Sequence, residues 1–180
     1  MKKSLLLLCS LLLLAPATVQ AANDKIAIPT YICAELITQP ITEGGEPPIF
    51  TALQLDGFVS AKLNAPVADA ATLPPVLKQV YTECQAKPTE KVVTIWQEVR
   101  KKMPTPADGM WRADKTTCKA YADNPDDGSG FVIWLDGYNR GKSDKPASVL
   151  NSDADLQAYL NMCSKQPTAL MLDIMSKSAR

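Results

Sequence analysis

Apolar residues recur every three or four positions along most of this chain, which is the pattern of a helix buried on one side. The clearest example runs from Val76 to Cys84 and follows Pro74 and Pro75, which suit a first helical turn. Another helix is predicted by apolar residues spaced by four, three and four positions, at Val92, Trp96, Val99 and Met103. No alternating strand pattern of useful length is present, so the sequence predicts an all-α fold.

A longer helix is predicted over Pro48–Leu63, with its apolar residues mainly on one side, and short helices are predicted over Tyr31–Ile37 and Cys118–Ala122. Gly57 lies inside the longer helix, where glycine lowers helix stability by about 1 kcal/mol relative to alanine. We expect that Gly57 allows close packing against a neighbouring helix.

Several polar residues stand where helices are expected to begin. Thr89 is expected to cap the helix that follows it and Thr168 to open the last helix, and Ser152-Asp153-Ala154-Asp155 resembles a capping box. Asn124–Gly130 is rich in turn-forming residues and is expected to be a loop, from which Ser129 caps the next helix.

Sequence landmarks of the first half return in the second half in the same order. Leu55-Asp56-Gly57-Phe58 returns as Leu135-Asp136-Gly137-Tyr138, and the run Cys84–Thr89 returns as Cys163–Thr168. Cys33 precedes the landmarks of the first half, and Cys118 precedes those of the second half. Such repetition indicates an internal duplication, so the sequence predicts two tandem helical units.

The predicted organisation has four parts. Residues 1–21 read as a signal peptide because two lysines precede an apolar run over Leu5–Leu14 and small residues end at Ala21. Residues 22–103 form the first unit, 104–116 the linker and 117–180 the second unit. We therefore expect a chain that is exported and does not insert into the membrane.

Charge narrows the choice of partner. Removal of residues 1–21 leaves 19 acidic and 17 basic side chains, so the formal net charge is −2. There is no basic excess of the kind that binds nucleic acid and no polybasic tract for a lipid surface.

Four cysteines remain after cleavage, two in each unit, which favours two disulfides in an exported protein. Of the three possible pairings, the repetition selects Cys33 with Cys84 and Cys118 with Cys163. Each bond closes a loop of about 50 residues and contributes on the order of 4 kcal/mol in the chain-entropy description.

No constellation of catalytic residues is present. The chain has no histidine, which removes ordinary nucleophile–base pairs and the common kind of zinc site. Asp56 and Asp136 recur in the duplication, and an ion-pair, capping or surface role is favoured over catalysis for both. We expect no enzyme activity, no cofactor and no metal.

Three stretches carry a resemblance to a known family: Thr117-Cys118-Lys119-Ala120-Tyr121, Leu135-Asp136-Gly137-Tyr138, and the run from Cys84 to Met103. Each half has an early cysteine, an apolar middle helix, a second cysteine near the end of a helix, and a final basic amphipathic helix. In these features the chain resembles the HdeA/HdeB family of periplasmic acid-stress chaperones, twice over. The resemblance implies one disulfide per unit and an internal pseudo-dimer of the two units, or a homodimer of the chain.

Two functional hypotheses follow. The resemblance implies an acid-activated holdase that binds unfolded periplasmic proteins through apolar helix faces, with Phe58, Trp96, Trp111, Trp134 and Tyr138 as candidate contact residues. The second hypothesis is a non-catalytic binding module, such as an inhibitor, immunity or envelope-assembly protein, that holds one periplasmic protein. An exposed Trp111 would favour a partner site, whereas a buried Trp111 would only dock the two units.

Overall fold

A computed structural model describes residues 26–39, 49–103, 108–109, 111–143 and 147–178, without the side chains of residues 125–129. The expected signal peptide at 1–21 and residues 104–107 of the expected linker lie outside the described residues. Within these ranges the chain forms helices and two very short strands, so the all-α prediction is confirmed. No helix among them has both the length and the apolar composition needed to cross a membrane.

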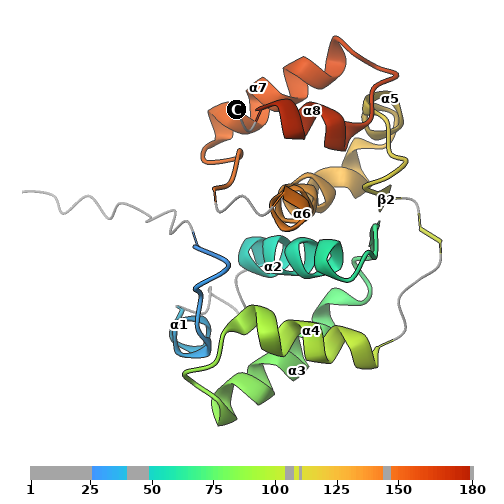
Figure 1. Ribbon diagram of the computed structural model, residues 1–180. Helices are drawn as coiled ribbons and strands as arrows, with labels where there is room; N and C mark the ends of the chain where they lie inside the picture. Colours follow the sequence, from blue (N-terminus) through green and yellow to red (C-terminus); the bar gives the residue numbers. More distant parts are fainter. Residues whose placement is uncertain (1–25, 40–48, 104–107, 110, 144–146, 179–180) are drawn as a thin grey trace, which may run out of the picture.

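The helices form two sets of four along the sequence. The first set is α1 (Cys33–Thr38), α2 (Ile49–Lys62), α3 (Leu73–Ala86) and α4 (Val92–Lys102). The second set is α5 (Cys118–Ala122), α6 (Pro125–Ser143), α7 (Asp153–Ser164) and α8 (Met171–Ser178). Figure 1 shows α2 and α6 side by side in the middle, with the other helices of each set on the two outer sides.

The two sets repeat the same local hydrogen bonds. The Cys33 N–H donates to the Glu90 carbonyl over 2.8 Å, and the Cys118 N–H donates to the Ala169 carbonyl over 3.0 Å. One antiparallel bridge accompanies each of these bonds, at Ile32–Lys91 in the first set and at Thr117–Leu170 in the second. In both sets the segment that precedes the first helix therefore pairs with the segment that precedes the last helix.

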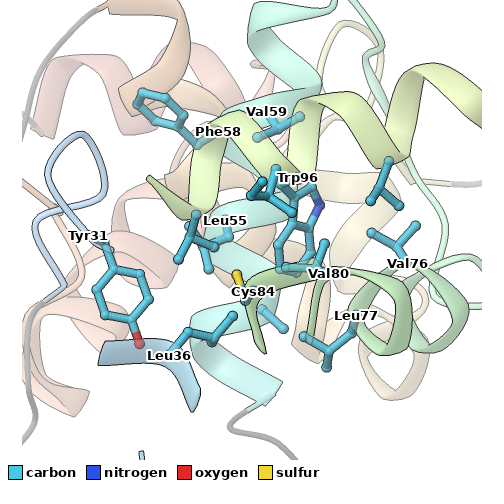
Figure 2. Packing of buried hydrophobic residues seen from close by; sticks show 14 of the residues in the cluster. Tyr31, Leu36, Leu55, Phe58, Val59, Val76, Leu77, Val80, Cys84 and Trp96 are labelled. Carbon is cyan, nitrogen blue, oxygen red and sulfur yellow. The ribbon is translucent and has the colours of Figure 1, made fainter. Parts of the chain in front are cut away.

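Each set of helices surrounds its own apolar cluster. The first cluster gathers residues of α1 to α4 around the fully buried Trp96, as Figure 2 shows, with Leu55, Val59 and Val80 close to the indole. The second cluster gathers residues of α5 to α8, including Trp134 and Tyr159. Leu53 packs against both clusters, so α2 contributes to both sides of the middle layer.

The helix starts at α4 and α8 differ from the sequence prediction. Thr89 does not cap α4, whose N-cap is Lys91, and Thr168 does not open α8, which begins at Met171. Lys91 and Leu170, which precede the two helices, form the bridges instead, and Lys91 has an extended conformation. A tertiary contact has therefore displaced the expected helix start.

The predicted loop at Asn124–Gly130 is also wrong, since α6 begins at Pro125 and Ser129 lies inside it. The same residues satisfy another rule, because proline is favoured in the first turn of a helix. The prediction at Ser152 is confirmed: its hydroxyl accepts a hydrogen bond from the Asp155 N–H over 3.2 Å at the start of α7.

Two short strands join the halves beside the middle helices. Strand β1 (Val67–Ala68) pairs antiparallel with strand β2 (Trp111–Arg112), with Val67 opposite Arg112 and Ala68 opposite Trp111. Trp111 was expected in the linker, and its backbone in fact connects the second half to the first.

Candidate functional site

The contact between α2 and α6 is the most extensive one between any two elements of the described part of the chain. Its closeness depends on glycines. A Cβ atom at Gly57 would overlap the backbone carbonyl of Trp134, and a Cβ atom at Gly137 would overlap the carbonyl of Gln54. The expected role of Gly57 in close helix packing is confirmed.

These contacts are reciprocal. Gly57 meets Trp134 and Gly137 meets Gln54, and Gln54 and Gly57 stand 80 positions before Trp134 and Gly137. Each helix therefore presents the same repeat positions to the other, as the two copies do in a two-fold symmetric dimer. The duplicated Leu-Asp-Gly motif lies at the centre of this contact.

The carboxylate of Asp56 connects the two halves inside the protein. Its Oδ1 accepts a hydrogen bond from Trp96 Nε1 over 3.0 Å, and its Oδ2 accepts one from Trp134 Nε1 over 2.9 Å. Trp96 belongs to α4 in the first half and Trp134 to α6 in the second. One buried carboxylate thus holds an indole from each half.

Arg100 supplies the charge that balances Asp56. Its Nε lies 3.4 Å from Asp56 Oδ1, and both side chains are almost fully buried. The guanidinium also donates to Ser60 Oγ over 3.4 Å and to Thr72 Oγ1 over 3.3 Å. Because a buried ion left without its partner is costly, these contacts make Asp56 and Arg100 dependent on each other.

Asp136, the repeat counterpart of Asp56, has different partners. Its carboxylate accepts hydrogen bonds from the Val149 N–H over 3.0 Å, from Ser148 Oγ over 2.8 Å and from Gln54 Nε2 over 3.3 Å. Burial raises the pKa of this carboxyl above its ordinary value, although the hydrogen bonds and the nearby Arg140 act in the opposite direction. Asp136 therefore fastens the segment that follows α6 and also reaches α2.

A row of aromatic rings extends along α6 from the surface to this junction. Trp111 stacks on Phe131 with ring centroids 5.4 Å apart, Phe131 on Trp134 at 6.0 Å, and Trp134 on Tyr138 at 5.2 Å. At the outer end, Tyr121 meets Trp111 edge to face at 5.9 Å. The row places most of the aromatic surface of the second half next to the contact with α2.

Most of the candidate contact residues lie inside the protein. Phe58, Trp96, Trp134 and Tyr138 are all buried, and Phe58 is the most exposed of the four at 7 %. Trp111 is half-buried in the aromatic row. The structure therefore places Trp134 at the α2–α6 contact through its bond to Asp56, with Tyr138 stacked on it in the second cluster. Phe58 and Trp96 belong to the first cluster, and Trp96 reaches the contact through Asp56.

The predicted disulfides are both present. Cys33 is bonded to Cys84 and joins α1 to α3, and Cys118 is bonded to Cys163 and joins α5 to α7. Neither bond crosses the contact between α2 and α6. Each half is therefore covalently closed by itself, and the junction between them is held by noncovalent contacts and by the chain connection.

Sequence reasoning missed the polar partners at the junction. Arg100 is one of three basic residues in the last turn of α4, and its burial against Asp56 has no local signal in the sequence. Gln54 and Ser148 likewise gave no indication that they would meet Asp136. The one useful signal was the repetition of Asp56 at Asp136, which marked the helices that would meet.

Some large apolar side chains are exposed elsewhere. Phe50 is 65 % exposed and Ile49 48 % exposed at the start of α2, and Met162 is exposed on α7. Among the residues that the structure describes, no three acidic or cysteine side chains lie close enough to hold a metal ion.

The chain was compared with protein-family models, with curated protein sequences and with solved structures, and it matches none of them.

Proposed function

We propose that the chain is an HdeA-like exported protein that acts in the periplasm as an acid-activated holdase for unfolded proteins. Its two intrachain disulfides support this proposal, because such bonds persist in oxidising compartments. The duplicated unit with one disulfide in each copy also agrees with the resemblance to the HdeA/HdeB family.

The observation that carries the proposal is the way in which apolar surface is stored between the halves. Trp134 and Tyr138 are buried on the α6 side of the α2–α6 contact and Phe58 in the first cluster beside α2, and the carboxylate of Asp56 links Trp134 to Arg100. The link depends on a buried charge, because a neutral side chain at position 56 would leave Arg100 without its counter-ion. Separation of the halves would uncover the aromatic side chains that bind unfolded clients.

The net charge of the protein at low pH also favours separation of the two halves. Below about pH 3 the 19 carboxylates are protonated, while 17 basic side chains and the new amino terminus keep their charge. The net charge is then near +18 by this count, and self-repulsion favours separation of the halves. The disulfide in each half limits further expansion, so the opened protein retains defined apolar surfaces.

The test is suppression of the aggregation of an unfolded client, followed by light scattering at pH 2.5 and pH 7 with the mature protein. We expect the wild type to suppress aggregation only at acid pH. The variant Asp56→Asn should suppress it at a higher pH than the wild type does, because Arg100 has then lost its counter-ion even at neutral pH. The repeat-matched control Asp136→Asn should not gain activity at neutral pH.

Two results would reject this function. One is the absence of suppression at both pH values while circular dichroism still shows the helices. The other is equal activity of the wild type at pH 2.5 and pH 7, since the apolar surface would then not depend on acid.

A second candidate function is a binding module for one periplasmic protein, favoured by the exposed Ile49 and Phe50 at the start of α2. Exposed apolar residues of this size occur at protein interfaces. In this case the variant Phe50→Ser would lose the partner and leave acid-dependent suppression of aggregation unchanged. Measurement of both properties on the same variant separates the two candidates.

A further inference from the structure

A surface cavity of about 460 Å³ lies in the first half, between α2, α4 and the segment before α1. Phe58, Val93 and Pro29 give it apolar walls, and Lys62 and Lys91 are also among its lining residues. Figure 2 shows Phe58 at the edge of the first core, away from Leu36 and Leu77. The volume falls within the range of about 300–1,000 Å³ that is typical of small-molecule sites.

Two lysines give the cavity its positive charge. Among the described residues that line it, Lys62 and Lys91 are the charged ones and none is acidic. Lys62 Nζ lies 5.5 Å from the centroid of the Phe58 ring, so one cationic group stands directly beside the apolar wall. An apolar surface next to cations matches a ligand that has an apolar chain and an anionic head.

The positive charge of Lys91 lies at the N-terminus of α4, where a cation is electrostatically unfavourable. Lys91 is the N-cap of α4, and the first turn of α4 contains no acidic residue. The N-terminus of a helix carries partial positive charge, so a cation is unfavourable there. An anion in the cavity would remove this unfavourable interaction.

The second half shows that the positive charge is not a requirement of the fold. By the repeat alignment, Lys62 corresponds to Lys142, but Lys91 corresponds to Leu170. In the second half, the counterpart of Pro29 is Asp114 and the counterpart of Thr94 is Asp173, and both are acidic. The counterpart positions of the second half thus carry one lysine and two aspartates, so the pair of lysines belongs to the first half alone.

From the cavity, its charge and this internal contrast, we propose that the first half binds a small single-chain amphiphile with a carboxylate head. The apolar chain lies against Phe58, Val93 and Pro29, and the head lies near Lys62 and Lys91. The site belongs to the folded protein at neutral pH and is independent of the proposed acid-activated opening.

The probes are decanoate, decanol and acetate, titrated into the full mature chain at pH 7.4 and low salt. Binding is followed by calorimetry and by the NMR shifts of the Val93 methyl groups. Decanoate should bind about tenfold more tightly than either decanol, which lacks the charge, or acetate, which lacks the chain. The shifts should be concentrated at Val93 and at the ring of Phe58.

The double variant Lys62→Met, Lys91→Met keeps the apolar stems and removes both charges. It should weaken decanoate binding about tenfold and leave decanol binding unchanged. The matched control is Lys78→Met, Lys101→Met, which removes two exposed lysines outside the cavity.

Three results would overturn the site: equal binding of decanoate and decanol, decanoate binding in the double variant that equals the wild type, or NMR shifts that lie away from Val93 and Phe58. Circular dichroism of the variants confirms that the helices are intact. Failure here would leave the holdase proposal standing, because client suppression at acid pH is measured without the probes.

Discussion

The indole N–H of Trp134 donates a 2.9 Å hydrogen bond to Asp56, a residue 78 positions earlier in the chain. In the reciprocal direction, Gln54 donates to Asp136 over 3.3 Å. The two repeated aspartates thus each accept a hydrogen bond from the opposite middle helix. The donors differ, so a duplicated backbone contact has acquired two different polar links.

The first of these links should be measurable as an interaction energy. Trp134→Phe keeps the aromatic ring and removes the donor to Asp56 Oδ2, which should reduce the free energy of unfolding by about 1–3 kcal/mol. In a double-mutant cycle with Asp56→Asn, the two changes should be non-additive by about 0.5–3 kcal/mol. Urea unfolding measures all four proteins, and strict additivity would contradict the link.

The glycine contact predicts opposite effects of the same substitution at two positions. Gly57→Ala places a methyl group against the backbone at Trp134 and should reduce the free energy of unfolding by about 1–3 kcal/mol. Gly130→Ala should increase it by up to about 1 kcal/mol, because its Cβ would lie 3.5 Å from Leu53 in ordinary contact and alanine favours a helix. Thermal unfolding followed by circular dichroism gives both values, and a Gly57→Ala protein as stable as the wild type would refute close packing.

Asp136 should stabilise the fold more at low pH than at neutral pH. Its pKa is raised in the folded protein, so the folded state binds the proton more strongly than the unfolded chain, whose carboxyl has a pKa of 3.8. The cost of burying the charge is present at neutral pH and disappears as the pH falls through the raised pKa. Relative to Asp136→Asn, the wild type should therefore gain stability on acidification.

Urea unfolding of both proteins between pH 7 and pH 3 tests this sign. A stability difference that stays constant with pH would show that the folded pKa is not raised. The direction also identifies Asp136 as a group that opposes acid opening, which is why the repeat-matched Asp136→Asn serves as the control for Asp56→Asn.

The two disulfides should contribute about equally and independently. They join residues that are 51 and 45 positions apart, and the entropic contribution varies only with the logarithm of loop length. Replacement of either pair by serine should cost about 4 kcal/mol in the chain-entropy description. Hydrogen exchange should show that each loss is largest in the half that contained the bond, and an equal loss in both halves would contradict separate cores.

The success of sequence reasoning followed the range of the interactions involved. The apolar spacing of Val92, Trp96 and Val99 predicted a buried helix face, and these residues are buried. The repeated cysteines predicted the disulfide pairing, and Gly57 predicted a close helix contact. All of these signals lie within one helix or in the repetition itself.

The failures involved residues whose role depends on distant partners. Thr89 is a residue type that often caps helices, but α4 starts later, after Lys91, which pairs with Ile32. Arg100 resembles an exposed basic residue at a helix end, and only the folded arrangement places it against Asp56. The local sequence around a polar residue does not show whether its side chain will be exposed or buried. Only the tertiary structure distinguishes the two cases.

The connection of α2 and α6 in one chain has a consequence for how their contact opens and closes. Because α2 and α6 belong to the same molecule, their separation is a unimolecular event. Its equilibrium therefore does not depend on protein concentration, unlike that of a dimer of separate chains. After a period in acid, a highly diluted protein would close this contact at the same rate as a concentrated one, because the partner helix remains tethered nearby.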